Sequence, residues 1–252
     1  MVTPKFKISK EDLEYGKNEL RQVLRDRPQM CDLVKEGDPI WLFAARGFAG
    51  ELSSSRLKWN SNEDFSFPNQ ACYNWGGPVV QIYSRRYDNK GKLLSAQECW
   101  SGLIYEIFNS SRYKENHAIL RDAISGKCSR DNYIKRSAKL EYLAELQHFG
   151  FFKKIWRPRM VPGETAIPIV WHLSDAELRF DELYAGWLKM NGTKGYPCGF
   201  YGKRYDREMA RVKTRLDKLR YLGSKLRHTN ETVLCLRALV EQSKLISKRH
   251  VT

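Results

Sequence analysis

Two carboxylates and an imidazole share one face of a predicted helix over residues 130–149, and this combination can bind a metal ion. They continue a stripe of residues three and four apart: Ile134, Ala138, Glu141, Glu145 and His148. Glu145 and His148 have the E-x-x-H spacing that carboxylate-bridged metal sites use in helical bundles. The stripe therefore predicts a candidate site for a divalent metal ion, formed by Glu141, Glu145 and His148. The alternative is a polar network without metal, paired with nearby bases: Arg112, Arg136 and Lys139.

A second set of polar residues lies on the predicted helix that follows Ser95. Residues 105–109, with the sequence YEIFN, have the register of the zincin motif H-E-x-x-H with both histidines replaced. Glu141, on the later helix, is placed to echo the third ligand of such a site. The imidazoles that bind zinc strongly are missing, so the pattern predicts at most a degenerate site. Its catalytic candidates are Glu106, Asn109 and Glu141, and the corresponding activity is that of a metal-dependent hydrolase or oxidoreductase.

The carboxyl-terminal region concentrates the positive charge of the chain. Residues 201–252 hold 14 Lys and Arg against 5 Asp and Glu, so they carry +9 of the net +15. One row of bases recurs every seven residues: Arg204, Arg211, Lys218 and Lys225. A second row follows the same repeat: Lys213, Arg220 and Arg227. Uncompensated rows of this kind are typical of surfaces that bind phosphate or another acidic partner.

The same region has the apolar periodicity of a two-helix hairpin. One long helix is predicted over residues 203–227, with a narrow apolar seam: Tyr205, Met209, Val212, Leu216, Leu219 and Leu226. A second helix over residues 231–247 is the predicted partner of this seam, and residues 228–230 form the connection. The basic rows flank the seam, so the hairpin leaves them on its outside.

We favour a non-enzymatic function in which the basic hairpin binds the backbone of RNA or DNA, or a ribonucleoprotein such as a ribosome. Phosphate neutralisation releases counterions and needs no base recognition, and nothing in the segment specifies bases. The main alternative for these rows is a solvated surface without a partner, and a scaffold that binds an acidic protein is a further alternative. We expect no membrane partner, because the basic rows lack bulky apolar anchors.

The rest of the sequence predicts the helices and strands that must position these residues. Capping patterns or helix-initiating residues begin helices at Ser9, Asp38, Ser95 and Ser174, and further helices are expected over residues 114–124 and 130–149, the latter ending at Gly150. Strands are expected at 79–83, followed by a short return strand, and at 167–171. Residues 47–78 are rich in Gly, Ser, Asn and Pro and predict a long irregular connection, and residues 157–168 a linker-like break.

Together these patterns predict a predominantly helical α+β protein with a small sheet. We expect a core domain over residues 1–190, a glycine-rich joint over 191–202 and the basic hairpin over 203–252. No run of apolar residues is long enough for a membrane span. The first sixteen residues lack the apolar stretch of a secretory signal, so we expect a cytoplasmic protein. No cofactor is expected apart from the alternative of a divalent metal ion.

Overall fold

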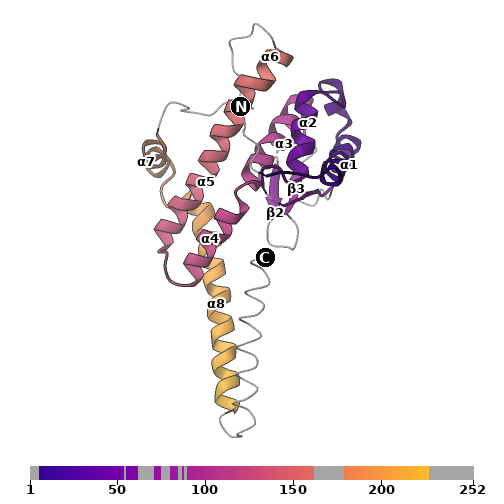
Figure 1. Cartoon of the computed structure of the whole chain (residues 1–252). Coiled ribbons are helices and arrows are strands. Elements are labelled where there is room, and N and C mark those ends of the chain that lie inside the picture. The colour runs from indigo at the N-terminus through magenta and orange to yellow at the C-terminus, as the bar shows by residue number, and fades with distance from the viewer. Residues whose placement is uncertain are drawn as a thin grey trace.

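The computed structural model describes residues 6–53, 55–61, 71–74, 80–84, 87, 90–161 and 179–226. For residues 71–74, 83–84 and 220–226 it describes the backbone alone. Helices dominate this part of the chain, and one small sheet accompanies them (Figure 1). The predicted fold class, a mainly helical α+β protein, is confirmed.

Three helices in the first half begin where the sequence predicts, because a side chain caps each one. Helix α1 (Lys10–Asp26) and helix α3 (Ala96–Ser110) begin with capping boxes at Ser9 and Ser95. Helix α2 (Pro39–Phe48) begins after Asp38, whose carboxylate accepts the backbone N–H of Ile40 at 2.7 Å. A short 3₁₀ helix, η1 (Pro28–Asp32), follows α1. These local signals set where the helices of the first half begin.

The later helices differ from the predicted ones mainly at their ends. They are α4 (Tyr113–Ile124), α5 (Arg130–Phe151), the π-helix η2 (Phe152–Trp156), α6 (Arg157–Met160), α7 (Phe180–Asn191) and α8 (Cys198–Leu226). The predicted end of α5 at Gly150 is wrong, and the predicted break from residue 157 begins later, because the chain stays helical through Met160. Burial of Phe151, Phe152 and Trp156 explains why a glycine does not end this helix.

The sheet has three strands in the order β1–β3–β2. Strand β3 (Val80–Ser84) confirms the predicted strand and pairs in parallel with β1 (Leu57–Trp59) and antiparallel with β2 (Ala71–Asn74). The prediction of an irregular connection over residues 47–78 is therefore wrong in two places. An antiparallel bridge between Tyr87 and Leu93 marks the predicted return of the chain. The predicted strand at 167–171 and the capping pattern at Ser174 lie outside the described residues.

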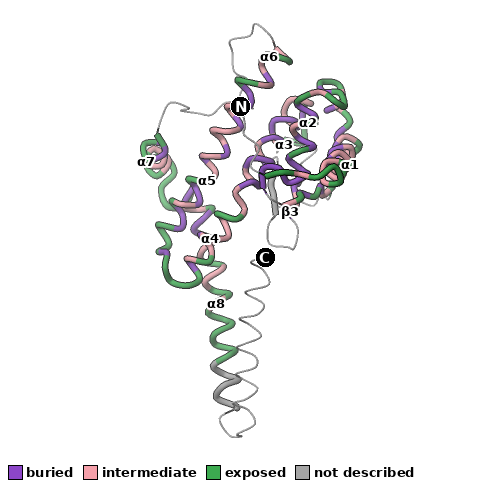
Figure 2. Tube along the Cα trace, in the orientation of Figure 1, coloured by how far each residue is buried: buried purple, intermediate pink, exposed green. Residues whose placement is uncertain are grey.

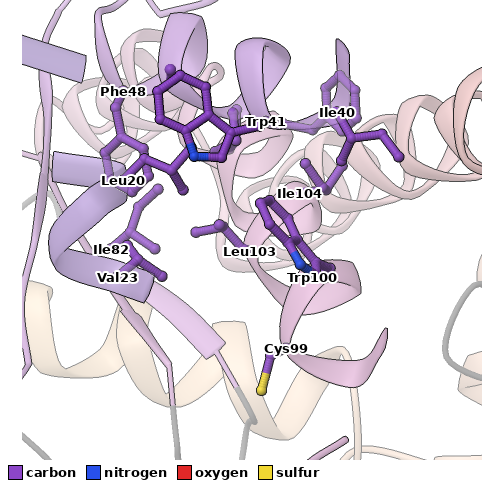
Figure 3. Close-up of a cluster of buried hydrophobic side chains, with 14 of the residues drawn as sticks. Leu20, Val23, Ile40, Trp41, Phe48, Ile82, Cys99, Trp100, Leu103 and Ile104 are labelled. Carbon is purple, nitrogen blue, oxygen red and sulfur yellow. The ribbon is translucent and has the colours of Figure 1, made fainter. Parts of the chain in front are cut away.

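Buried apolar side chains form two clusters, and α5 contributes to both. The first cluster gathers side chains of α1, α2, the sheet, α3 and the carboxyl end of α5, and Figure 3 shows part of it around Trp41 and Trp100. The indole N–H of Trp100 donates to the carbonyl of Met30 at 2.9 Å. The second cluster joins α4, the first half of α5, α7 and the start of α8. Helix α5 is thus the shared wall between the two halves of the described structure.

A close backbone approach holds the first half together. A Cβ atom at Gly16 in α1 would clash with the carbonyl oxygen of Ala45 in α2. Only glycine lets the two helices pack at this separation. The first cluster and its helices are therefore fixed against each other by shape as well as by apolar burial.

Candidate functional site

One carboxylate, Glu141 on α5, accepts hydrogen bonds from three tyrosines. The hydroxyl of Tyr105 on α3 donates to Oε1 at 3.2 Å. The hydroxyls of Tyr196, before α8, and Tyr201, within α8, donate to Oε2 at 2.9 and 2.5 Å. Hydrogen bonds to a carboxylate are stronger than those between neutral groups. Glu141 therefore connects α3, α5 and the start of α8 at one point.

Two of these tyrosines, Tyr105 and Tyr196, keep their protons in this setting. Burial raises the pKa of Tyr105 well above its ordinary value, and the negative charge of Glu141 raises it further. Burial and the charge of Glu141 likewise raise the pKa of Tyr196. A protonated phenol donates a hydrogen bond and carries no charge. These groups act as fixed donors to Glu141.

Two further glutamates lie beside Glu141, as the helical stripes predict. Glu106 is 3% exposed, and burial, reinforced by the charge of Glu141, raises its pKa to about 8. Burial and Glu141 also raise the pKa of Glu145 to about 7. A hydrogen bond with Asn109 opposes this rise in the pKa of Glu106. The Oε2 atom of Glu106 is buried and has no hydrogen-bond partner among the described residues. Near neutral pH, Glu106 is therefore mostly uncharged.

We call this group the acid–tyrosine cluster: Glu106, Glu141, Glu145, Tyr105, Tyr196 and Tyr201. Its carboxyls can lie together because protonation removes charge that burial would otherwise make unfavourable. The tyrosines were not among the residues that the sequence singled out as partners. Tyr196 and Tyr201 belong to a glycine-rich stretch, so no periodic pattern links them to Glu141.

His148, which the sequence predicts as a metal ligand, lies next to the cluster and contacts Ser101 and Tyr105 instead. Its Nε2 atom lies 3.1 Å from the hydroxyl of Ser101, and its ring meets that of Tyr105 edge-on at 5.7 Å. Burial lowers the pKa of His148 to about 4, so the ring is neutral at physiological pH. Within the described residues, no three His, Cys, Asp or Glu side chains are grouped so that they could hold a metal ion. The geometry of Glu141, Glu145 and His148 gives the metal alternative no support.

Helix α8 begins at Cys198, five residues earlier than predicted, and its first turns are held by the body of the protein. Tyr201 is 7% exposed and belongs to the second apolar cluster, with Tyr205 and Met209 packed against that cluster. Arg130 on α5 forms a two-pronged ion pair with Asp206, at 2.9 and 3.1 Å. This segment of the predicted joint is therefore helical and in contact with α5.

Beyond these contacts, α8 extends away from the rest of the described structure (Figures 1 and 2). We call residues 210–219 the outer part of α8. Every residue of this part is exposed except Val212, which is half-buried. The seam residues Leu216 and Leu219 are 48% and 49% exposed. The predicted partner of the seam, the helix over 231–247, lies outside the described residues, so the hairpin stays a prediction.

The structure separates the predicted basic residues into different environments. Arg204 is half-buried and engaged with neighbours, and Arg211 forms an ion pair with Glu208 at 2.9 Å. Lys213 and Lys218 are exposed and form no salt bridge within the described ranges. The side chains of Arg220 and Lys225, and the whole of Arg227, lie outside what the structure describes. Within the described part of the chain, Lys213 and Lys218 are thus the two members of the predicted rows that are exposed and form no salt bridge.

One basic residue was missed because it breaks the seven-residue repeat. Arg215 lies one turn beyond Arg211 on the side of the first row, and it is exposed without a salt bridge in the described part of the chain. A helical-wheel criterion, which accepts spacings of three and four, would have found it. We call Lys213, Arg215 and Lys218 the α8 cations.

No family model, curated protein or solved structure matches the chain. Among the described helices, none combines the length and the apolar character needed to cross a membrane.

Proposed function

We propose that the protein binds the sugar–phosphate backbone of RNA or DNA through the outer part of α8. The observation that carries this proposal is the exposure of Lys213, Arg215 and Lys218 on a helix that extends beyond the body, with no salt bridge to neutralise them among the described residues. The proposed partner is a nucleic acid or a ribonucleoprotein, and the proposed location is the cytoplasm.

The physical basis is the release of counterions from the nucleic acid. Each lysine or arginine that neutralises a phosphate displaces condensed cations, so binding weakens steeply as salt is added. The outer part of α8 offers cations on two sides of the helix, with Arg215 and Lys218 on one and Lys213 on the other. A protruding helix of this kind can approach a duplex without steric interference from the body. Sequence-tolerant binding is expected, because contacts to phosphates carry no base information.

The acid–tyrosine cluster has a supporting role in this proposal. All three of its tyrosine hydroxyls donate to Glu141, and Glu106 is buried. Of those tyrosines, Tyr196 lies just before α8 and Tyr201 lies in its first turn. The cluster therefore fixes the root of the helix that carries the α8 cations.

The proposal is tested with the triple variant Lys213→Gln/Arg215→Gln/Lys218→Gln. Binding to duplex RNA and duplex DNA is measured as a function of salt by fluorescence anisotropy. The slope of log affinity against log salt should fall by about 2–3, since each lost phosphate contact reduces it by about 1. The matched control is Lys7→Gln/Lys10→Gln/Lys58→Gln, which removes the same charge from exposed positions on α1, β1 and the segment before α1.

Equal slopes for the two triple variants would contradict the proposal, because net charge alone would then explain the binding. Retention of a protein partner by the full-length chain after nuclease treatment, together with unchanged nucleic-acid binding in the α8 variant, would favour the acidic-protein alternative. Circular dichroism of each variant checks that α8 keeps its helical content.

A further inference from the structure

A second basic surface lies at the end of the long helical segment formed by α5, η2 and α6. Four of the seven residues from 153 to 159 are basic, and none is acidic: Lys153, Lys154, Arg157 and Arg159. We call these residues the η2–α6 patch. No periodic pattern marks it in the sequence, because Lys153 and Lys154 lie between the predicted helix and the predicted break, and Arg157 and Arg159 lie within that break.

The π-helix decides which side chains of this segment face outward. The backbone N–H of Arg157 donates to the carbonyl of Phe152, five residues back, which is the π-helical pattern. The wider turn keeps Phe152 and Trp156 both buried in the first apolar cluster, 0% and 1% exposed. Lys153 and Lys154 are consequently exposed side by side. Two fully buried aromatic rings thus hold a pair of cations at the surface.

The charge of this patch is only partly matched by acids. Arg159 lies 3.9 Å from Asp38, at the outer limit of an ion pair. The ammonium group of Lys153 lies 4.5 Å from the ring centre of Phe149, a contact that leaves its charge in place. Lys154 is exposed and forms no salt bridge in the described ranges, and Arg157 is half-buried without one. The patch can therefore neutralise phosphates without first breaking a strong internal ion pair.

The η2–α6 patch and the α8 cations lie at opposite ends of the described structure (Figure 1). The distance to each surface can be counted along a helix from the contact between Glu141 and Tyr201. At 1.5 Å per residue, Lys154 lies about 20 Å along α5 from Glu141, and Lys218 about 26 Å along α8 from Tyr201. Because α5 and α8 run in roughly opposite directions from this contact (Figure 1), the separation of the two surfaces approaches the sum of these lengths, at most about 45 Å or about 13 base pairs of duplex.

We infer that the η2–α6 patch is a second phosphate-contacting surface, engaged by the same duplex that binds α8. This inference rests on the proposed function and assigns it a minimum ligand length. A duplex of about 10 base pairs is too short to span the two surfaces, whereas one of about 24 base pairs reaches both. The second contact then becomes intramolecular, so it adds affinity only for the longer duplex.

The test uses the full chain with Lys153→Gln/Lys154→Gln and duplexes of about 10 and about 24 base pairs. For the longer duplex, the salt slope should fall by about 2 and affinity near 0.1 M salt should drop by about 10–100-fold. For the shorter duplex, the slope should be unchanged within error, since α8 alone suffices. The double variant Lys7→Gln/Lys10→Gln is the control and should behave as wild type with both lengths.

The possible failures are distinguishable. No change on the longer duplex, while the α8 triple variant still loses binding, overturns the second surface and leaves the proposed function intact. Equal losses on both duplexes overturn the shared footprint, because the patch would then act as an independent site. If neither the α8 variant nor the patch variant differs from its control, the proposed function fails and the inference fails with it. Urea unfolding of both variants excludes a general loss of structure.

Discussion

The acid–tyrosine cluster and the outer part of α8 use charged side chains in opposite ways. In the cluster, burial and one neighbouring charge raise the pKa of Glu106 to about 8 and that of Glu145 to about 7, so charge is removed by protonation. On α8, Lys213, Arg215 and Lys218 stay in water. Both regions contain polar residues at helical spacing: Glu141 and Glu145 are four apart, and Arg215 and Lys218 are three apart. Whether such residues stay charged depends on their exposure to water rather than on their spacing.

Substitutions in the two regions should therefore affect different quantities, the free energy of unfolding in the cluster and the binding affinity on α8. Breaking a buried polar network leaves donors without partners, and each unsatisfied group is costly. An exposed cation is surrounded by water, and removing it costs little free energy of unfolding because water fills the space. Substitutions in the cluster should therefore change the free energy of unfolding, whereas those on α8 should change binding alone.

The largest effect is expected for Glu141→Ala. This change leaves the hydroxyls of Tyr105, Tyr196 and Tyr201 without their shared acceptor. We expect a loss of about 3–5 kcal/mol in the free energy of unfolding, measured by urea titration. The matched control Glu11→Ala removes a carboxylate that is 85% exposed and should cost less than about 1 kcal/mol. Similar losses in the two variants would remove the distinction between the regions.

The second effect is a pH dependence that Glu106 imposes on stability. Its folded-state pKa of about 8 lies above the ordinary value of 4.5, so the folded protein retains a proton that the unfolded chain releases. The associated stability is fully present below pH 4.5 and is lost as pH rises through about 8. In Glu106→Gln, the fall in unfolding free energy between pH 5 and pH 8.5 should be smaller by about 3–4 kcal/mol. Glu145 contributes in the same direction up to about pH 7, so part of the fall should remain.

The control for this prediction is the same substitution at an exposed carboxyl, Glu11→Gln. Its stability should follow the wild-type pH profile throughout. A profile for Glu106→Gln that is parallel to that of the wild type would show that the buried carboxyl is ionised, against the expectation from its burial.

A smaller effect is expected for Tyr201→Phe, which keeps the ring and removes one hydrogen bond to Glu141. We expect a loss of about 1–2 kcal/mol in unfolding free energy, because the acceptor keeps two other donors. Tyr205→Phe, one turn further along α8, is the matched control, since that ring packs on Tyr133 at 5.5 Å and its hydroxyl donates to no acceptor within the described chain. If Tyr205→Phe is as destabilising as Tyr201→Phe, ring packing rather than the hydrogen bond anchors α8.

Local signals explain what could be predicted from the sequence. The caps at Ser9, Asp38 and Ser95 act within one helical turn, so their helices were placed correctly. The strands β1 and β2 were missed because each is three or four residues long and depends on pairing with β3. The continuation of the helix past Gly150 depends on the burial of Phe151, Phe152 and Trp156 against elements that are distant in the sequence, and no local pattern encodes that burial.

The same division applies to the candidate sites. The helical stripes correctly predicted that Glu106 and Glu141 would meet, because each stripe faces the neighbouring helix. The partners Tyr196 and Tyr201 could not be predicted, since they lie in a glycine-rich stretch that signals a joint and are far from Glu141 in sequence. On α8, a repeat of seven identified Lys213 and Lys218 but could not show that Arg211 is paired with Glu208.

The smallest effect on stability, and one of opposite sign on binding, is expected for Glu208→Gln. This carboxylate lies 2.9 Å from Arg211 and 3.6 Å from Arg207, so it neutralises charge at the start of the outer part of α8. Surface ion pairs contribute about 0–1 kcal/mol, and the free energy of unfolding should therefore change little. Releasing the two guanidinium groups should strengthen binding to duplex nucleic acid and steepen the salt slope by about 1. A gain of affinity on removing an acid distinguishes direct phosphate contact from a loss of structure, which can only weaken binding. Unchanged affinity in Glu208→Gln would place the phosphate contacts elsewhere on the protein and end the functional contrast between α8 and the buried cluster.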